Sequence, residues 1–291
     1  MRLDTPSGNF DPTRRSIAAS LFFAGYAPAA LSSCASPVTT PSTELIVEDV
    51  HINGAGGYAL PAYVARPSGR ERRASIIVVN EIFGVHEYIK DVCRRFAREG
   101  YVAIAPDYFD RAGDPAPLTD FAAIREIVNT ATYEQVMLDT QGAVTWLGAQ
   151  QVVDGDAIGV TGFCWGGAVT WMAAARFDAI KAGVAWYGRL ARPETPPTND
   201  PDRPWPVDIA GDLQTPVLGL YAAEDRGIPV ETVEQMRNAL AATGNPSGSE
   251  IVVYPGAQHG FHADYRESYD AEAAADGWSR ALAWFRAYGV G

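Results

Sequence analysis

The 291-residue sequence has few cysteines, little positive charge and no long apolar run, and each shortage excludes a class of protein. Its three cysteines, Cys34, Cys93 and Cys164, are too few and too scattered for a disulfide scaffold or a thiolate metal site. Lysines and arginines number 23 against 35 aspartates and glutamates, and the net charge of −12 repels nucleic-acid phosphates. No stretch has the roughly 18 to 20 uncharged apolar residues of a membrane-spanning helix. We therefore expect no nucleic-acid partner and no membrane span.

The sequence does contain enough apolar material for a large core. Hydrophobic residues make up 47% of the chain and aromatic residues 11%, which excludes a wholly disordered protein. An α/β enzyme fold commonly fills about 200 to 250 residues as one unit. Because no internal repeat or break in pattern is visible, we predict one domain over residues 44–291.

Residues 1–43 differ from the rest of the chain. Arg14 and Arg15 precede residues 16–43, which carry no charge and are mildly apolar over residues 17–31. A positive end followed by an apolar and then a small-residue stretch is typical of an export signal. The paired arginines resemble a twin-arginine signal, which exports folded proteins, although the usual aromatic residue and lysine are absent. We expect export to the periplasm or beyond; the alternative is an apolar helix packed on a cytoplasmic domain.

Cys34 ends the sequence Leu-Ser-Ser-Cys at residues 31–34, which resembles the lipobox of bacterial lipoproteins. An acyl chain on Cys34 would anchor the protein to a membrane without spanning it. The alternative is a chance match in a tract rich in serine and alanine. Residues 35–43, rich in proline, serine and threonine, predict a linker. Since the predicted fold does not need residues 1–43, we expect them to be dispensable for activity.

From residue 44 onward, short apolar runs alternate with stretches of helical spacing. Glycines at residues 53–57 separate the first two runs, which predicts a hairpin. The alternation predicts an α/β-hydrolase type of fold, in which helices cover both faces of a mostly parallel sheet. The expected strands are residues 44–52, 58–66, 75–79, 102–105, 157–162, 182–186, 217–222 and 250–254; the expected helices are residues 87–99, 120–129, 133–149, 168–177, 230–242 and 268–288; residues 189–212, rich in proline, are expected as loop.

Residues 158–167 read Ile-Gly-Val-Thr-Gly-Phe-Cys-Trp-Gly-Gly and give the strongest indication of chemistry. An apolar strand that runs through Gly-x-Cys-x-Gly-Gly into a helix is the layout of a nucleophile elbow. The turn would place Cys164 at a helix N-terminus, where backbone N–H groups favour a thiolate. The alternatives are a phosphate-binding turn, although the dinucleotide and P-loop fingerprints are absent, and a buried structural cysteine. Cys93, at helical spacing among apolar residues, is expected in the core.

A cysteine nucleophile needs a base and an acid that orients the base. In the α/β-hydrolase arrangement the acid and then the histidine follow later strands. The strand over residues 217–222 is followed by Asp225, and the strand over residues 250–254 by His259. Glu224 is a rival for the acid, and Asp225 could instead cap a turn. The other histidines are expected in the hairpin (His51), at a helix start (His86) and as a candidate lining the pocket (His262).

Three motifs together resemble the dienelactone hydrolase family, the carboxymethylenebutenolidase-like α/β-hydrolases, over about residues 44–288. Residues 80–84 read Asn-Glu-Ile-Phe-Gly, residues 162–167 read Gly-Phe-Cys-Trp-Gly-Gly, and residues 255–261 read Pro-Gly-Ala-Gln-His-Gly-Phe. The combination is specific, whereas each motif alone is modest. The resemblance implies an α/β-hydrolase fold and a small ester or lactone as substrate, and we expect no cofactor and no metal.

The resemblance also implies roles for four side chains. Cys164 would be the nucleophile, His259 the base and Asp225 the residue that orients His259. Glu81 would pair with the thiol at rest and be displaced by substrate, so that the thiolate forms. The alternative for Glu81 is a loop carboxylate that caps the following helix.

The expected reaction runs through a thioester, in which backbone N–H groups of Trp165 and Ile82 would hold the oxyanion. A thiol acyltransferase or amidase and an inactive binding protein are the alternative functions. Family members that act on dienelactone hold its carboxylate with an arginine shortly after the catalytic histidine, where this sequence has Ala263. We therefore expect a substrate other than dienelactone itself. The arginines that could replace the missing one are Arg111, Arg125, Arg189, Arg226 and Arg266.

Overall fold

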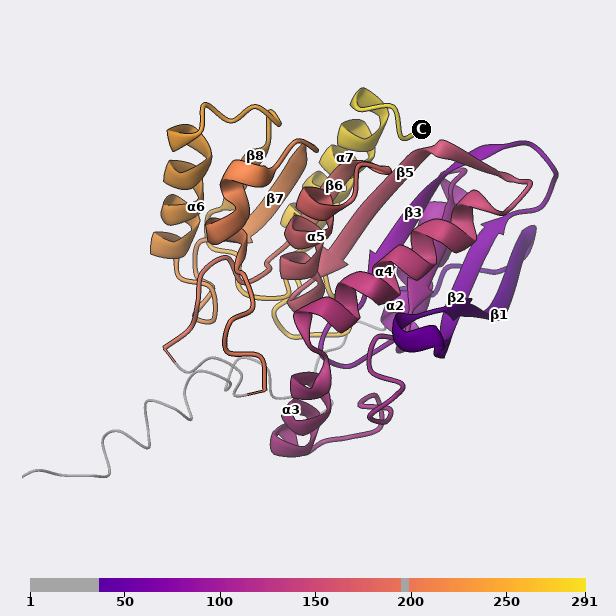
Figure 1. The fold of residues 1–291 in the computed structure, drawn as a ribbon, viewed down its shortest axis with the longest axis horizontal. Coiled ribbons are helices and arrows are strands. Elements are labelled where there is room, and N and C mark those ends of the chain that lie inside the picture. Colours follow the sequence, from indigo (N-terminus) through magenta and orange to yellow (C-terminus); the bar gives the residue numbers. More distant parts are fainter. Residues whose placement is uncertain (1–36, 195–198) are drawn as a thin grey trace, which may run out of the picture.

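An eight-stranded sheet runs through residues 37–194 and 199–291, the part of the chain that the computed structural model describes (Figure 1). The strand order is β1-β2-β4-β3-β5-β6-β7-β8. β2 pairs antiparallel with both β1 and β4, and all pairs from β4 to β8 are parallel. The predicted mostly parallel sheet and the N-terminal hairpin are thus confirmed. The strands are β1 (Leu45–Asn53), β2 (Ala59–Pro67), β3 (Arg73–Val79), β4 (Val102–Pro106), β5 (Val153–Phe163), β6 (Ile180–Trp186), β7 (Val217–Ala222) and β8 (Glu250–Tyr254).

Helices cover both faces of this sheet, as the alternating pattern predicted. In Figure 1, α4, α5 and α6 lie in front of the sheet and α2 and α7 behind it. The two sides bury separate apolar clusters, one that includes α2 and α7 and others that include α4, α5 and α6. None of the helices in the described residues is long and apolar enough to cross a membrane. The helices are α2 (Glu87–Arg98), α3 (Phe121–Thr130), α4 (Tyr133–Gly148), α5 (Trp165–Arg176), α6 (Val230–Ala242) and α7 (Ala271–Ala287), with short 3₁₀ turns η1 (Ala55–Gly57) and η2 (Pro206–Asp212).

The differences from the predicted elements have local causes. α5 begins at Trp165 rather than at residue 168. Gly166 and Gly167 have low helix propensity, so the sequence pattern did not predict the first turn of this helix, but their small size is needed for close packing. A Cβ atom on Gly166 would lie 2.5 Å from the Val79 carbonyl oxygen. The predicted loop over residues 189–212 contains η2, whose first residue is Pro206, a position where the missing N–H costs little.

The described part of the predicted linker, residues 37–43, lies along α2; we call it the strap. The Thr40 N–H donates to Asp91 Oδ1 at 2.6 Å, and Arg94 Nε donates to the Thr40 carbonyl at 3.1 Å. Arg98 donates to the carbonyl oxygens of Pro41 and Thr43. The strap thus contacts the fold, while the expectation that residues 1–43 are dispensable stays a prediction. The paired arginines and Cys34 lie outside the described residues.

Candidate active site

The turn between β5 and α5 places Cys164 at the carboxyl edge of the sheet. Cys164 has φ 55° and ψ −113°, a backbone conformation that non-glycine residues rarely adopt. A Cβ atom on Gly162 would overlap the Gly166 carbonyl, so the strand and helix close tightly here. The Cys164 N–H donates to the Trp186 carbonyl at 3.0 Å, which anchors the turn to β6. This is the sharp strand-to-helix turn that the motif predicted.

Asp225 and His259 meet at the ends of β7 and β8. Asp225 Oδ1 accepts the backbone N–H groups of Gly227 at 2.7 Å and Ile228 at 2.9 Å. Its Oδ2 accepts from His259 Nδ1 at 2.6 Å. The loop backbone thus fixes the carboxylate, and the carboxylate fixes the orientation of the imidazole. The rival Glu224 is exposed, and of the two carboxylates it is Asp225 that contacts His259.

Cys164 and Asp225 together set the protonation of His259. Burial lowers the pKa of His259, but the charges of Asp225 and Cys164, and hydrogen bonding to both, raise it overall to about 9. The Tyr187 ring packs edge-on against the imidazole at 5.1 Å between centroids and limits its rotation. His259 is therefore protonated at neutral pH, beside the side chain of Cys164.

Glu81 lies fully buried in the loop after β3, among polar partners. Its Oε1 accepts from His86 Nε2 at 2.9 Å and from the Tyr265 hydroxyl, and its Oε2 accepts from Arg266 at 2.9 Å. Burial raises the pKa of Glu81, but Arg266 and His86 lower it overall to about 2. The structure here differs from the pairing expected at rest, because no hydrogen bond of the described residues joins Glu81 to Cys164. A buried carboxylate needs a compensating cation, and Arg266 supplies it.

Arg266 is the candidate arginine that the fold brings to the site. Besides Glu81 it contacts Tyr265, and the charge of Cys164 contributes to its raised pKa.

Arg111 instead pairs with Asp139 of α4, and Ala263 is fully buried. Of the remaining candidates, Arg125 and Arg226 are exposed and Arg189 is half-buried.

The two backbone N–H groups predicted to hold the oxyanion belong to the elbow and to a neighbouring loop. Trp165 is the first residue of α5, and Ile82 follows Glu81 in the loop after β3. Gly166 packs against the carbonyl oxygens of Val79 and Asn80, so this loop lies beside the elbow. Among the hydrogen bonds of residues 37–194 and 199–291, neither N–H donates to a protein acceptor. Such donors can stabilise the charge of a tetrahedral intermediate.

His86 and Tyr265 are partners of Glu81 that the sequence motifs did not indicate. The only available signals were that His86 follows Glu81 by five residues and that Tyr265 precedes Arg266.

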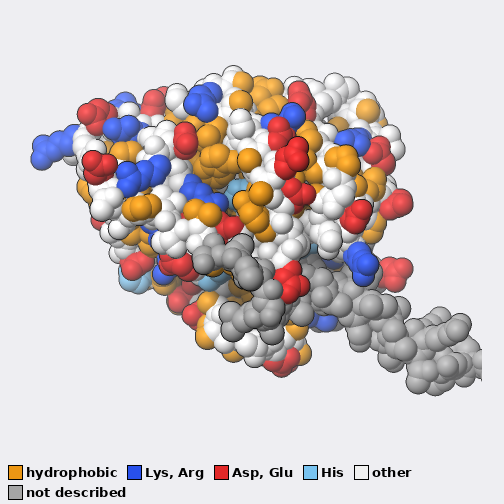
Figure 2. All heavy atoms as spheres, turned by 180° about the vertical axis from the view of Figure 1, so that it is seen from behind, with side chains coloured by type: hydrophobic (Ala, Val, Ile, Leu, Met, Phe, Trp, Pro, Cys, Tyr) orange, Lys and Arg blue, Asp and Glu red, His pale blue; other side chains and the backbone are white. Residues whose placement is uncertain are grey.

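His262, a candidate for lining the catalytic pocket, instead lines a hollow of about 370 Å³ on the face that carries α2 and α7, the face shown in Figure 2. The Tyr88 hydroxyl and His262 Nδ1 share a hydrogen bond of 2.6 Å, and burial lowers the pKa of His262 to about 3. His262 is therefore neutral and part of the core.

Comparison with known proteins places this chain within a family. The model of the dienelactone hydrolase family matches residues 60–289. A Methylorubrum extorquens protein classed as a carboxymethylenebutenolidase is 46% identical over 282 residues, which cover 96% of this chain and 94% of the relative. An Escherichia coli K12 protein of the same class is 45% identical over 267 residues, which cover 91% and 96%. A Klebsiella pneumoniae structure described as a dienelactone hydrolase has 48% identity and a TM-score of 0.78, and the match covers 84% of this chain and 99% of that one. The chain belongs to the dienelactone hydrolase family of α/β-hydrolases.

Proposed function

We propose that the protein hydrolyses carboxylic esters or lactones through a thioester formed on Cys164. One observation carries this proposal: Cys164 occupies a strained elbow beside His259, whose pKa is raised to about 9 and whose Nδ1 is held by Asp225 at 2.6 Å. Membership of the family supports hydrolysis of a small molecule as the reaction class. The roles of the individual residues are our proposal.

In the first step the Cys164 thiolate attacks the carbonyl carbon, and the N–H groups of Trp165 and Ile82 bind the oxyanion. As the oxyanion collapses, the C–O bond breaks, and the His259 imidazolium gives its proton to the departing alcohol or enol oxygen. In the second step the neutral imidazole takes a proton from water, which attacks the thioester. Collapse then expels the Cys164 thiolate, releases the carboxylic acid and leaves His259 protonated.

The groups around Cys164 indicate which substrates suit this site. A thiolate is a good leaving group, so the intermediate returns to reactants unless the substrate's own leaving group is also good. Activated esters and enol lactones therefore suit the enzyme better than amides. Arg266 lies close enough to Cys164 to respond to its charge, and we assign it as the arginine that meets an acidic substrate. Such a substrate would displace Glu81 from Arg266, which assigns Glu81 the role of a carboxylate that substrate binding releases.

A panel of small aryl esters and unsaturated lactones, assayed with wild type and Cys164→Ala, tests the proposal. Wild type should release the carboxylic acid, and the variant should lose turnover by a factor on the order of 10⁵ or more. The variant should remain folded, since the change removes a single sulfur atom, so a loss of turnover reports on chemistry. Retained turnover in the variant would refute the nucleophile. Transfer of the acyl group to an added amine or alcohol in preference to water would favour an acyltransferase.

A further inference from the structure

The turn over residues 259–266 carries three groups of the site, His259, Tyr265 and Arg266. Two backbone hydrogen bonds shape it, from the Ala263 N–H to the Gly260 carbonyl at 2.8 Å and from the Arg266 N–H to the Ala263 carbonyl at 3.0 Å. Asp264 lies in this turn beside Tyr265 and Arg266 and is 4% exposed. Its carboxylate does not join the other site groups; it accepts a hydrogen bond from Arg95 of α2. The catalytic turn is therefore attached to α2 by this ion pair, in addition to the hydrogen bond between Tyr88 and His262.

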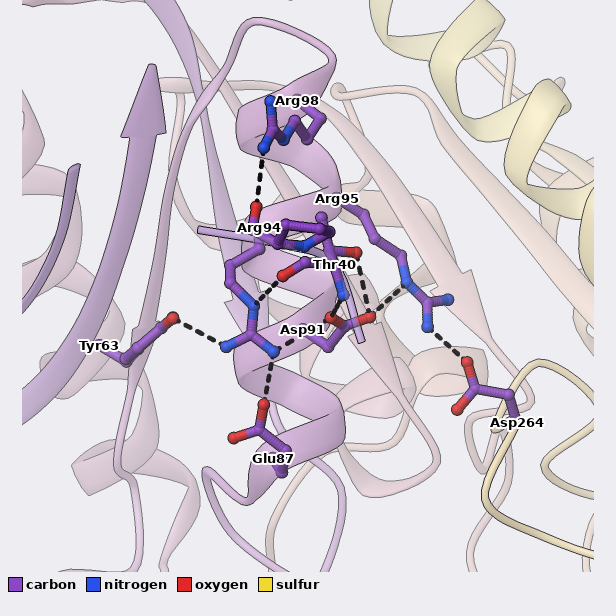
Figure 3. A network of polar contacts seen from close by, with 9 residues as sticks. Thr40, Tyr63, Glu87, Asp91, Arg94, Arg95, Arg98 and Asp264 are labelled. Carbon is purple, nitrogen blue, oxygen red and sulfur yellow. Dashed lines mark hydrogen bonds and ion pairs between the residues drawn. The ribbon is translucent and has the colours of Figure 1, made fainter. Parts of the chain in front are cut away.

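Arg95 is in turn held by a network that reaches the strap (Figure 3). Arg95 Nε donates to Asp91 Oδ2 at 2.6 Å, while its Nη2 donates to Asp264 Oδ2. Asp91 is 1% exposed and also accepts from Arg94 Nη2 at 3.0 Å and from the Thr40 N–H at 2.6 Å. A continuous path of hydrogen bonds thus runs from the strap through Asp91 and Arg95 to the catalytic turn.

We propose that Arg95 is a positioning residue for the reaction, acting through Asp264 to hold the turn over residues 259–266, and that the strap keeps Arg95 in place through Asp91. This rests on the proposed function, which makes His259 and Arg266 the groups that must be positioned. Removing the strap would therefore lower the rate of the reaction at a site that the strap does not contact.

The physical argument starts from the two buried carboxylates of Asp91 and Asp264. One planar guanidinium satisfies both, and its fork fixes their relative position more narrowly than a single charge would. Without Arg95, Asp264 would be a buried and uncompensated charge, and the turn would have to move to hydrate it. Because His259 and Arg266 lie at the two ends of that turn, such a movement would disturb both. A misplacement of about 1 Å can lower a rate by about 100-fold.

A second ion pair of the same kind provides a matched control. Arg111 donates to both oxygens of Asp139 at 2.8 Å. The Arg95 and Arg111 side chains are 19% and 20% exposed, and the Asp264 and Asp139 side chains 5% and 0%. The Arg111 pair joins η1 to α4 and lies far along the chain from the catalytic turn. If Arg95 had a purely structural role, replacing either arginine should change stability and kcat to the same extent.

The test compares Arg95→Met with Arg111→Met at a temperature where both are folded. We expect comparable losses in unfolding midpoint, but only Arg95→Met should lower kcat, by about 10- to 100-fold, with a smaller change in KM. Only Arg95→Met should also shift the pH profile of Cys164 alkylation by iodoacetamide, and Arg95→Lys should restore part of both. Alkylation needs no substrate, so it tests positioning even if turnover does not use Cys164. Equal effects of the two variants on kcat and alkylation would overturn the proposal.

Two truncated chains test the part played by the strap. A chain beginning at residue 37 should keep the wild-type kcat, whereas one beginning at residue 44 should lower kcat in the same direction as Arg95→Met and by a smaller factor. Since both changes act on one path, combining the second truncation with Arg95→Met should lower kcat by less than the product of the separate factors. Full multiplication of the two factors, or wild-type kcat in the chain beginning at residue 44, would refute the coupling.

Discussion

The regions around Cys93 and Cys164 place the same side chain in two chemical settings. Both thiols belong to one apolar cluster, with exposures of 0% and 5%. Cys93 lies in the middle of α2, where burial raises the pKa of its thiol. Cys164 lies on a strained turn at a helix N-terminus, within reach of His259. Burial alone therefore does not distinguish the two thiols, and the reactivity that we propose for Cys164 rests on the imidazole and the backbone around it.

After the loss of Cys164 itself, the largest effect should follow from removing the carboxylate that orients His259. Asp225→Asn keeps the shape of the site but no longer stabilises an imidazolium, so turnover should fall by about 10³- to 10⁴-fold, as expected for the acid of a catalytic triad. The pKa of His259 should fall, and alkylation of Cys164 should then require a higher pH. Stopped-flow alkylation and steady-state rates measure both. Turnover within tenfold of wild type would mean that the difference between the Cys93 and Cys164 regions does not depend on Asp225.

A smaller effect is expected from Glu81→Gln, because this residue acts beside the thiol rather than on the imidazole. We expect turnover to fall by about 10- to 100-fold, the rate equivalent of the roughly 1.5 to 3 kcal/mol of a hydrogen bond to a charged group. Glu81 has a pKa of about 2 in the folded protein, below its ordinary value, so it stabilises the fold above about pH 4.5 and stops doing so as the pH falls toward 2. Acid unfolding of wild type should therefore be steeper over this range than that of the variant. Parallel unfolding curves would contradict the assigned ion pair with Arg266.

How far the sequence predicts this site depends on the separation of the interacting residues. The elbow around Cys164 is a local motif, and the order of Asp225 and His259 after later strands follows from the topology of a parallel sheet. The contacts of Glu81 with Arg266 and of Tyr88 with His262 join residues more than 170 positions apart, and no local pattern encodes them. The contacts of the strap were not predicted either, because proline, serine and threonine indicate a linker but not the side chains of α2 that donate to its backbone.

For Cys93 we expect an effect on stability and none on chemistry. Cys93→Ala leaves a small cavity in the core, which should lower the free energy of unfolding by about 1 kcal/mol. Urea unfolding and kcat, measured on the same preparation, separate the two quantities. If kcat fell severalfold while stability was unchanged, Cys93 would not be the inert member of the comparison.

The smallest effect on turnover should come from residues 1–36, which we propose act in export rather than in catalysis. A chain beginning at residue 37 should have the wild-type kcat. When residues 1–43 are fused to a reporter that must fold before export, the fusion should leave the cytoplasm, and replacing Arg14 and Arg15 by lysine should stop it. A fusion that stays cytoplasmic would exclude a signal. Export that survives the lysine replacements would favour the lipobox at Cys34 and the general route.

Trapping the acyl-enzyme tests most directly that Cys164, and not Cys93, carries the reaction. Wild type is mixed with an aryl ester that deacylates slowly and is quenched in acid, and its intact mass and digested peptides are then measured. We predict a mass increase equal to one acyl group, located on Cys164, and no adduct in Cys164→Ala. An acyl group on another residue, or a burst of phenol with no adduct on Cys164, would contradict the account.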